Sequence, residues 1–164
     1  MNREGLEKIF NEDLGTSSFP LLAEIYMSEG EYQRARQVCD IGLLLNPNNN
    51  DGKFILAKIA IIEDQLSKAE KLLKEIIKSD DLYINGMKML IMIYQNHKSN
   101  HSSMVKTAQK ILELLPGDEF ASKILKGSKT KTKTITTQKR KTHTLKRKSL
   151  NIAQKNKKKL ITKK

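Results

Sequence analysis

The fold is decided by residues 19–26, FPLLAEIY, because the pattern of this stretch returns at a spacing of 34 residues. The positions that recur at this spacing are Leu22, Leu56 and Leu90; Tyr26, Ala60 and Tyr94; Ala23 and Ala57; and Ala35 and Ala69. The helix-breaking positions Pro47, Asp81 and Pro116 are spaced by 34 and 35 residues. A fixed period of this length indicates a repeat architecture in which each repeat is one supersecondary unit.

Each repeat contains two amphipathic stripes, which predict two helices. In the first repeat the stripes are Phe19, Leu22, Ala23 and Tyr26, followed by Tyr32, Ala35, Val38, Cys39 and Gly42. Their spacing of three and four residues is that of one helix face. Ser17 is the expected cap of the first helix, and Pro20 falls in its first turn, where a missing N–H costs no hydrogen bond. Gly30 separates the two helices and Pro47 follows the second, so the pattern predicts an all-α chain.

Composition divides the chain of 164 residues after Lys126. Residues 1–126 carry 16 basic and 18 acidic side chains, whereas residues 127–164 carry 15 basic side chains and no acidic one. The second part has no aromatic side chain that could build a core, and its like charges repel one another. We therefore predict a helical-repeat domain over residues 1–126 and a disordered polybasic tail over residues 127–164.

The repeats resemble the tetratricopeptide repeat family. The residues that match the family signature are Phe19, Leu22, Ala23, Tyr26, Ala35, Cys39 and Pro47; then Leu56, Ala57, Ala69 and Leu73; then Leu90, Tyr94, Ala108 and Pro116. The resemblance implies a right-handed α-solenoid with repeats over residues 16–49, 50–83 and 84–118. A half unit over residues 1–15 would precede these repeats, and a short capping helix over residues 118–126 would follow them.

The resemblance also implies a binding groove, because the first helix of each repeat lines the concave face of such a solenoid. Counting helical turns gives the predicted groove residues: Leu21, Glu24, Ser28, Phe54, Lys58, Ile61, Ile62, Lys88, Met92 and Gln95. A contiguous exposed apolar surface usually marks an interaction site. We therefore predict that a peptide or helix of a partner protein binds there. The alternative is that Ile61 and Ile62 only pack against a helix of the next repeat.

One specialisation of the family does not fit this sequence. Tetratricopeptide domains that grip the C-terminal carboxylate of chaperones carry a basic and an asparagine side chain on the first helix of their first repeat. This chain has Pro20 and Glu24 there. Because the Glu24 carboxylate would repel a ligand carboxylate, this binding mode is not predicted.

The sequence favours a non-catalytic protein without a cofactor or a bound metal. It has no glycine-rich phosphate loop, no nucleophile elbow and no ligand cluster with metal spacing. His97 and His101 flank a predicted turn, so they are not expected to hold a metal. Cys39 is expected to be a small core residue, and Asp80 and Asp81 are expected to cap a helix.

We also expect a cytoplasmic protein. The longest apolar run, residues 89–94, is far shorter than the ~20 residues that span a bilayer. Residues 1–7 carry acidic side chains where a signal peptide would need an apolar stretch. The single cysteine permits no intrachain disulfide. The sequence predicts no particular oligomeric state.

The tail is expected to bind a polyanion, because a cationic chain releases condensed counterions on binding. Its densest clusters, the predicted polyanion-binding residues, are Lys139, Arg140 and Lys141; Lys146, Arg147 and Lys148; and Lys157, Lys158 and Lys159. Nucleic acid is the favoured ligand. It would be contacted without sequence preference, since the tail lacks aromatic side chains and is rich in lysine rather than arginine. The alternatives are an anionic membrane surface, an acidic protein and no ligand at all.

Two functions remain open at this stage. The first is an adaptor that binds a protein partner in the groove and adds electrostatic affinity for a polyanion through the tail. The alternative is a nucleic-acid-associated protein in which the tail binds the DNA or RNA backbone and the repeats serve only assembly.

If the tail binds duplex DNA through phosphates, log K should fall linearly with log salt concentration. The expected slope is about −5 to −9, corresponding to about 6–10 phosphate contacts. Affinity measured by fluorescence anisotropy should barely differ between unrelated sequences, because lysine on phosphate carries no base information. A strong sequence preference would contradict backbone binding.

Overall fold

A computed structural model describes residues 2–96 and 100–128 of the chain. The chain divides into two units, Met1–Ala121 and Ser122–Lys164, and each is described by itself. His97 and all the predicted polyanion-binding residues lie outside the described residues. The predicted division after Lys126 therefore stays a prediction.

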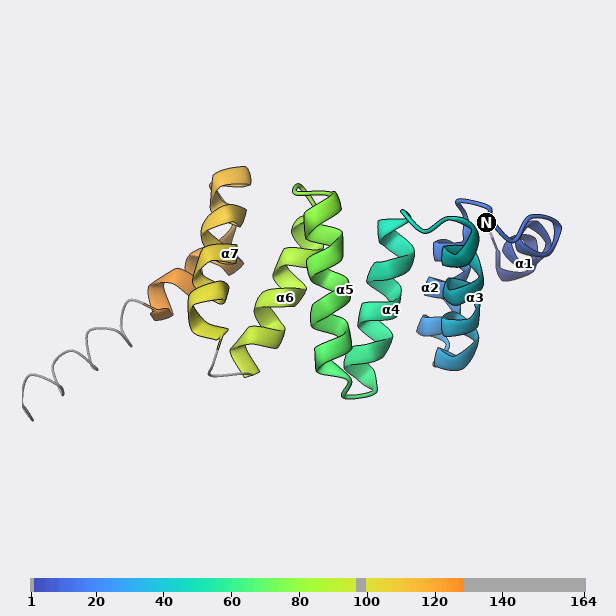
Figure 1. The fold of residues 1–164 in the computed structure, drawn as a ribbon, viewed down its shortest axis with the longest axis horizontal. Helices are drawn as coiled ribbons and strands as arrows, with labels where there is room; N and C mark the ends of the chain where they lie inside the picture. The colour runs from blue at the N-terminus through green and yellow to red at the C-terminus, as the bar shows by residue number, and fades with distance from the viewer. Residues whose placement is uncertain (1, 97–99, 129–164) are drawn as a thin grey trace, which may run out of the picture. The chain divides into compact units, whose positions relative to one another are not determined.

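The first unit is built from helices (Figure 1). They are α1 (Arg3–Glu12), α2 (Phe19–Ser28), α3 (Tyr32–Leu45), α4 (Asn50–Ile62), α5 (Leu66–Ser79), α6 (Ile84–Asn96) and α7 (His101–Leu114). Residues 119–128 are also helical, and the division between the two units falls inside this segment. The described residues contain no strand, as predicted.

The helices pack as successive pairs. α2 packs against α3, α4 against α5 and α6 against α7, while α3 packs against α4 and α5 against α6. α2 also contacts α4, so the first helices of the first two repeats lie side by side. This arrangement places α2, α4 and α6 as the first helices of the three predicted repeats.

The turns inside the first two repeats have the same backbone geometry. Gly30 and Asp64, 34 residues apart, both have left-handed backbone conformations, with φ of 78° and 58°. The amide of the next residue bonds back to the last helical turn in each case, from Glu31 to the Tyr26 carbonyl at 2.8 Å and from Gln65 to the Ala60 carbonyl at 2.7 Å. This pattern is the Schellman motif, in which glycine is favoured and aspartate is tolerated.

The start of α2 differs slightly from the expectation. Its N-cap is Ser18 rather than Ser17, and the Ser18 side chain makes no capping hydrogen bond. Pro20 lies in the first turn as predicted. Because a proline has no N–H to satisfy, this helix start depends less on a side-chain cap.

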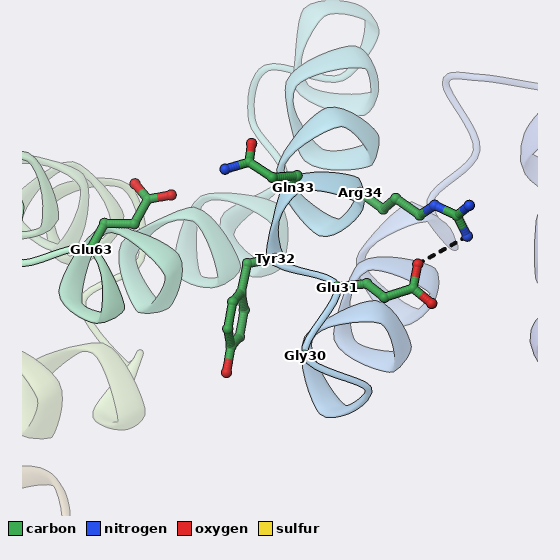
Figure 2. A pocket seen from close by; sticks show the side chains of 6 residues that line it. All are labelled: Gly30, Glu31, Tyr32, Gln33, Arg34 and Glu63. Carbon is green, nitrogen blue, oxygen red and sulfur yellow. Dashed lines mark ion pairs between the residues drawn. The ribbon is translucent and has the colours of Figure 1, made fainter.

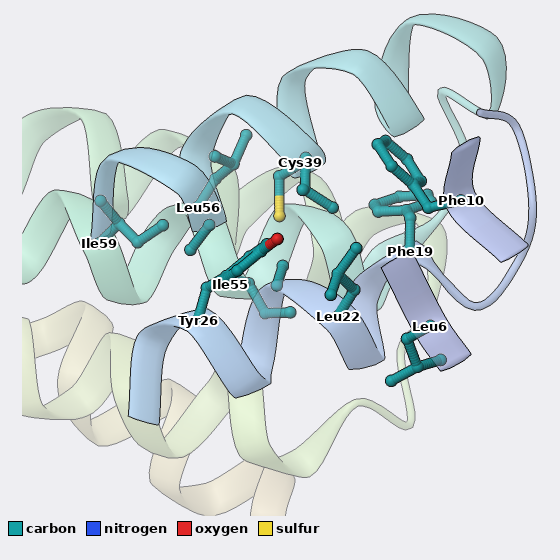
Figure 3. Close-up of a cluster of buried hydrophobic side chains, with 12 residues drawn as sticks. Leu6, Phe10, Phe19, Leu22, Tyr26, Cys39, Ile55, Leu56 and Ile59 are labelled. Carbon is teal, nitrogen blue, oxygen red and sulfur yellow. The ribbon is translucent and has the colours of Figure 1, made fainter. Parts of the chain in front are cut away.

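A continuous cluster of buried apolar side chains joins α2 and α3 of the first repeat to α4 of the second (Figure 3). Ala23 and Ala35 are fully buried between α2 and α3, and the fully buried Ala57 and Ala69 occupy the matching positions in α4 and α5. Small residues at these four positions let the paired helices approach closely. Leu6 and Phe10 extend the cluster into α1.

The Phe19 ring lies against two glycines of different helices. A Cβ atom at Gly42 of α3 would overlap this ring, and one at Gly52 of α4 would lie 2.5 Å from its Cε2 atom. Phe19 itself is fully buried. The missing Cβ atoms therefore make the space in which one aromatic ring joins α2, α3 and α4.

Gly42→Ala should lower the free energy of unfolding by about 1–3 kcal/mol, because overpacking in a rigid core outweighs the alanine gain in helix propensity of about 1 kcal/mol. Urea denaturation followed by circular dichroism measures this change. Gly117→Ala is the matched control, since a Cβ there meets no atom within 4 Å. Adding Phe19→Leu to Gly42→Ala should recover part of the loss. Equal stability of Gly42→Ala and the native chain would contradict the packing.

Candidate functional site

The predicted groove residues fall at matching positions of the three first helices. The residues that lie 34 positions apart, and so match between repeats, are Phe54 with Lys88; Glu24 with Lys58 and Met92; Ile61 with Gln95; and Ser28 with Ile62. Leu21 is in register with the buried Ile55 rather than with Phe54. We call the surface formed by Glu24, Ser28, Phe54, Lys58, Ile61, Ile62, Lys88, Met92 and Gln95 the first-helix face.

Exposed apolar side chains lie on this face. Ile62 is 50% exposed and Met92 is 56% exposed, although both are large hydrophobic residues on helices that are otherwise well packed. Phe54 and Ile61 are half-buried, and Ser28 and Gln95 are exposed. Ile62 is thus more exposed than Ile61, and the alternative that both only pack against a helix of the next repeat stays a prediction.

An ion pair joins the first helices of the first two repeats. The Lys58 Nζ atom lies 2.7 Å from the Glu24 Oε1 atom, which brings α4 to α2 across the face. The same ammonium lies 5.1 Å from the centre of the Phe54 ring, a favourable position for a cation over an aromatic face. Lys58 thus has two partners within the protein.

An aromatic pair continues this surface toward α6. The rings of Phe54 and Tyr83 meet edge to face with centres 5.4 Å apart. The Tyr83 hydroxyl donates a hydrogen bond of 2.7 Å to the Asp51 Oδ1 atom. Burial, together with this bond to Asp51, raises the pKa of Tyr83 above its usual range.

Asp51 and Tyr83 were not among the predicted groove residues. A signal for Asp51 was present, since residues 51, 54, 58, 61 and 62 share one face of a helix at three- and four-residue spacing. Tyr83 precedes the first residue of α6, where helical periodicity gives no direction for a side chain.

The second lysine of the face is also paired. Lys88 of α6 forms an ion pair with Asp118, whose side chain is almost fully buried. The Asp118 Oδ1 atom accepts a 2.8 Å hydrogen bond from the Ala121 amide, the geometry of a helix N-cap. The ion pair with Lys88 and the bond from Ala121 hold the pKa of Asp118 below its usual value.

The residues considered for other chemistry have structural roles. Cys39 is fully buried, and burial raises the pKa of its thiol to about 12. Asp80 is the C-cap residue of α5, and its side chain accepts a hydrogen bond from the Leu82 amide in the following turn. Asp81 lies in that turn and pairs with Lys110 at 3.3 Å. Among the described residues there is no cluster of three potential metal ligands. No helix in the described part of the chain is long and apolar enough to cross a membrane.

An open hollow of about 410 Å³ lies at the turn between α2 and α3 (Figure 2). It is lined by Gly30, Glu31, Tyr32, Gln33, Arg34 and Glu63. Glu31 is paired with Arg34 at 2.9 Å and with Arg3 at 3.1 Å, and Glu63 is paired with Arg36. The charged groups around this hollow are therefore engaged within the protein, and none of the predicted groove residues lines it.

Acidification should reduce the stabilisation of the fold by the charged Asp118 side chain. The folded-state pKa of Asp118 lies below the value of about 3.9 in an unfolded chain. The charged Asp118 side chain therefore makes its full contribution to the free energy of unfolding well above pH 4. That contribution is lost as the pH falls toward the folded-state pKa. Asp118→Ala should cost about 0.5–2 kcal/mol at pH 7, the usual effect of losing an N-cap. Thermal unfolding at pH 7 and pH 3 should show that the melting temperatures of the native chain and of Asp118→Ala differ less at pH 3 than at pH 7. An equal difference at both pH values would exclude a charged Asp118 as the stabilising group.

Comparison with known proteins identifies the fold. No protein-family model matches the sequence, and no curated protein matches it. The chain is similar to the structure of MamA, with a TM-score of 0.65 and 17% identity over 77% of this chain and 69% of MamA.

Two further structures agree. YrrB, described as a TPR protein with an unusual peptide-binding site, has a TM-score of 0.67 and 15% identity over 76% of this chain and 64% of YrrB. The first TPR of Spaghetti (RPAP3), bound to the HSP90 peptide SRMEEVD, has a TM-score of 0.61 and 17% identity over 71% of this chain and 95% of that chain. These similarities confirm the predicted fold: an all-α, right-handed solenoid of tetratricopeptide-like repeats.

Proposed function

We propose that this protein is a non-catalytic adaptor that binds a peptide or helix of a partner protein on its first-helix face. The observation that carries the proposal is the exposure of Ile62 on α4 and of Met92 on α6, both half exposed or more. Large apolar side chains that stay exposed on a folded surface are typical of an interaction site. The peptide-bound Spaghetti structure and the peptide-binding site of YrrB support a peptide ligand for this fold.

The charges of the face indicate how such a ligand would be recognised. Both lysines of the face have acidic partners, Lys58 with Glu24 and Lys88 with Asp118. A ligand carboxylate would have to displace these partners, and it would also meet the negative charge of Glu24. We therefore propose that apolar side chains of an internal segment or helix, rather than a terminal carboxylate, make the main contacts.

The polybasic tail would add electrostatic affinity for a polyanion close to the bound partner. Its support is the sequence alone, 15 basic side chains with no acidic one over residues 127–164. Nucleic acid remains the favoured polyanion for this segment, bound through its phosphates.

Met92→Asp and Ile62→Asp should each reduce partner capture at least tenfold, because each introduces a charge at the centre of the proposed apolar contact. Quantitative affinity capture from the native host measures this loss. Leu44→Asp is the matched control, since Leu44 is 82% exposed but lies on a second helix, α3. Far-ultraviolet circular dichroism should show unchanged helicity in all three variants. Equal capture by Met92→Asp and Leu44→Asp would refute the proposal.

A further inference from the structure

Met92 is the most exposed sulfur-containing residue in the described part of the chain. It is 56% exposed, whereas Met87 is fully buried and Met104 is 9% exposed. Met27 and Met89 are partly buried. A dissolved oxidant has to reach the thioether sulfur directly, so burial protects a methionine from oxidation. Among the described methionines, Met92 is therefore expected to react first.

The single cysteine of the chain does not compete for the oxidant. Cys39 is fully buried, and burial raises the pKa of its thiol to about 12. Because the thiolate rather than the thiol reacts with peroxides, this cysteine is protected both by its position and by its proton. Oxidation of the described residues by a peroxide is thus directed to Met92.

The packing of α6 does not depend on the Met92 side chain. The neighbouring Ile91 and Ile93 are buried, with 0% and 3% of their surface exposed, and they attach this part of the helix to the core. Met92 lies between them on the exposed side of α6, in line with Lys88 and Gln95 at spacings of four and three residues. A change of polarity at Met92 therefore alters the surface and leaves the core intact.

Oxidation of a methionine by hydrogen peroxide is a transfer of one oxygen atom. The thioether sulfur attacks one peroxide oxygen, and the O–O bond breaks as the S–O bond forms. The proton carried with the transferred oxygen passes to the leaving hydroxide, which departs as water. The sulfur loses two electrons to the peroxide, and the product is a polar sulfoxide. Because a polar group held against an apolar ligand without a hydrogen-bond partner costs free energy, the sulfoxide should weaken an apolar contact at this position.

We propose that Met92 is a site of reversible oxidation that controls partner binding on the first-helix face. A peroxide forms the sulfoxide and weakens binding. A methionine sulfoxide reductase restores the thioether, with a dithiol supplying two electrons and the oxygen leaving as water. The exposure of Met92 gives both the oxidant and the reductase access to it. This inference rests on the function proposed above, because it assigns a regulation to the same face.

The chemical step is tested on the full 164-residue chain without a partner. The chain is treated with hydrogen peroxide, and its tryptic peptides are followed by mass spectrometry. Fragmentation of peptide 89–98 separates Met92 from Met89. Met92 should be oxidised about tenfold faster than the fully buried Met87, and circular dichroism should show unchanged helicity. Equal oxidation rates at Met92 and Met87 would overturn the proposal.

The effect on binding is measured with a defined set of proteins, those that the untreated chain captures from the native host and that Met92→Asp does not capture. The peroxide-treated chain should capture these proteins about tenfold less, because the sulfoxide replaces an apolar contact. Treatment with a methionine sulfoxide reductase and dithiothreitol should restore the capture. Failure of the reductase to restore it would overturn the reversibility.

Two variants separate Met92 from the other oxidisable residues, and their readout is the ratio of capture after peroxide to capture before it. In Met92→Leu this ratio should not fall, because leucine has no sulfur. Adding Leu44→Met to Met92→Leu moves an oxidisable side chain to α3, at a position where Leu44 is 82% exposed. Mass spectrometry should show oxidation at position 44, and the ratio should again not fall.

The outcomes distinguish this inference from the proposed function. If no captured protein depends on Met92 before treatment, the proposed function fails and the regulation fails with it. If capture depends on Met92 but the sulfoxide form captures equally well, only the regulation is overturned. A loss of capture that persists in peroxide-treated Met92→Leu would place the sensitive group elsewhere and would also overturn the regulation.

Discussion

The close approach of the two helices inside a repeat is the constraint on which the rest of the structure depends. It requires small side chains at Ala23 and Ala35 in one repeat and at Ala57 and Ala69 in the next, and all four are fully buried. In the first two repeats the two helices are joined by a turn of the same geometry. α2 and α4 then lie side by side, and residues 34 apart in sequence, such as Glu24 and Lys58, become neighbours on one surface.

Polar contacts between repeats decide the chemical character of that surface. Glu24 with Lys58 and Tyr83 with Asp51 join elements of successive repeats, and Lys88 with Asp118 joins α6 to the N-cap of the last helical segment. Each contact holds the solenoid together and also occupies a charge that a ligand could otherwise use. Ile62 and Met92 stay exposed on this face together with the polar Ser28 and Gln95, and these two apolar side chains are the physical reason for proposing an internal peptide or a helix as the ligand.

The sequence was sufficient to predict the fold because helix pairing depends on periodic residues. The spacing of Leu22, Leu56 and Leu90 predicted the first helices, and Gly30 marked the turn that Asp64 repeats. The candidate site was harder to predict from the sequence. Tyr83 lies in a turn, where periodicity does not give direction, and the pairing of Lys58 and Lys88 depends on residues 30 or more positions away. Leu21 shows the same limit, since its exposure depends on which helix lies beside α2, not on its own helix.

Site-specific photo-crosslinking in the native host tests the central claim most directly, that the first helices form the partner-binding surface. A photoreactive amino acid at position 92, on α6, should yield a discrete crosslinked product with a partner protein. The same amino acid at position 44, on α3, should yield none, although Leu44 is more exposed than Met92. Products from position 44 and none from position 92 would place the binding surface on the second helices and contradict the account.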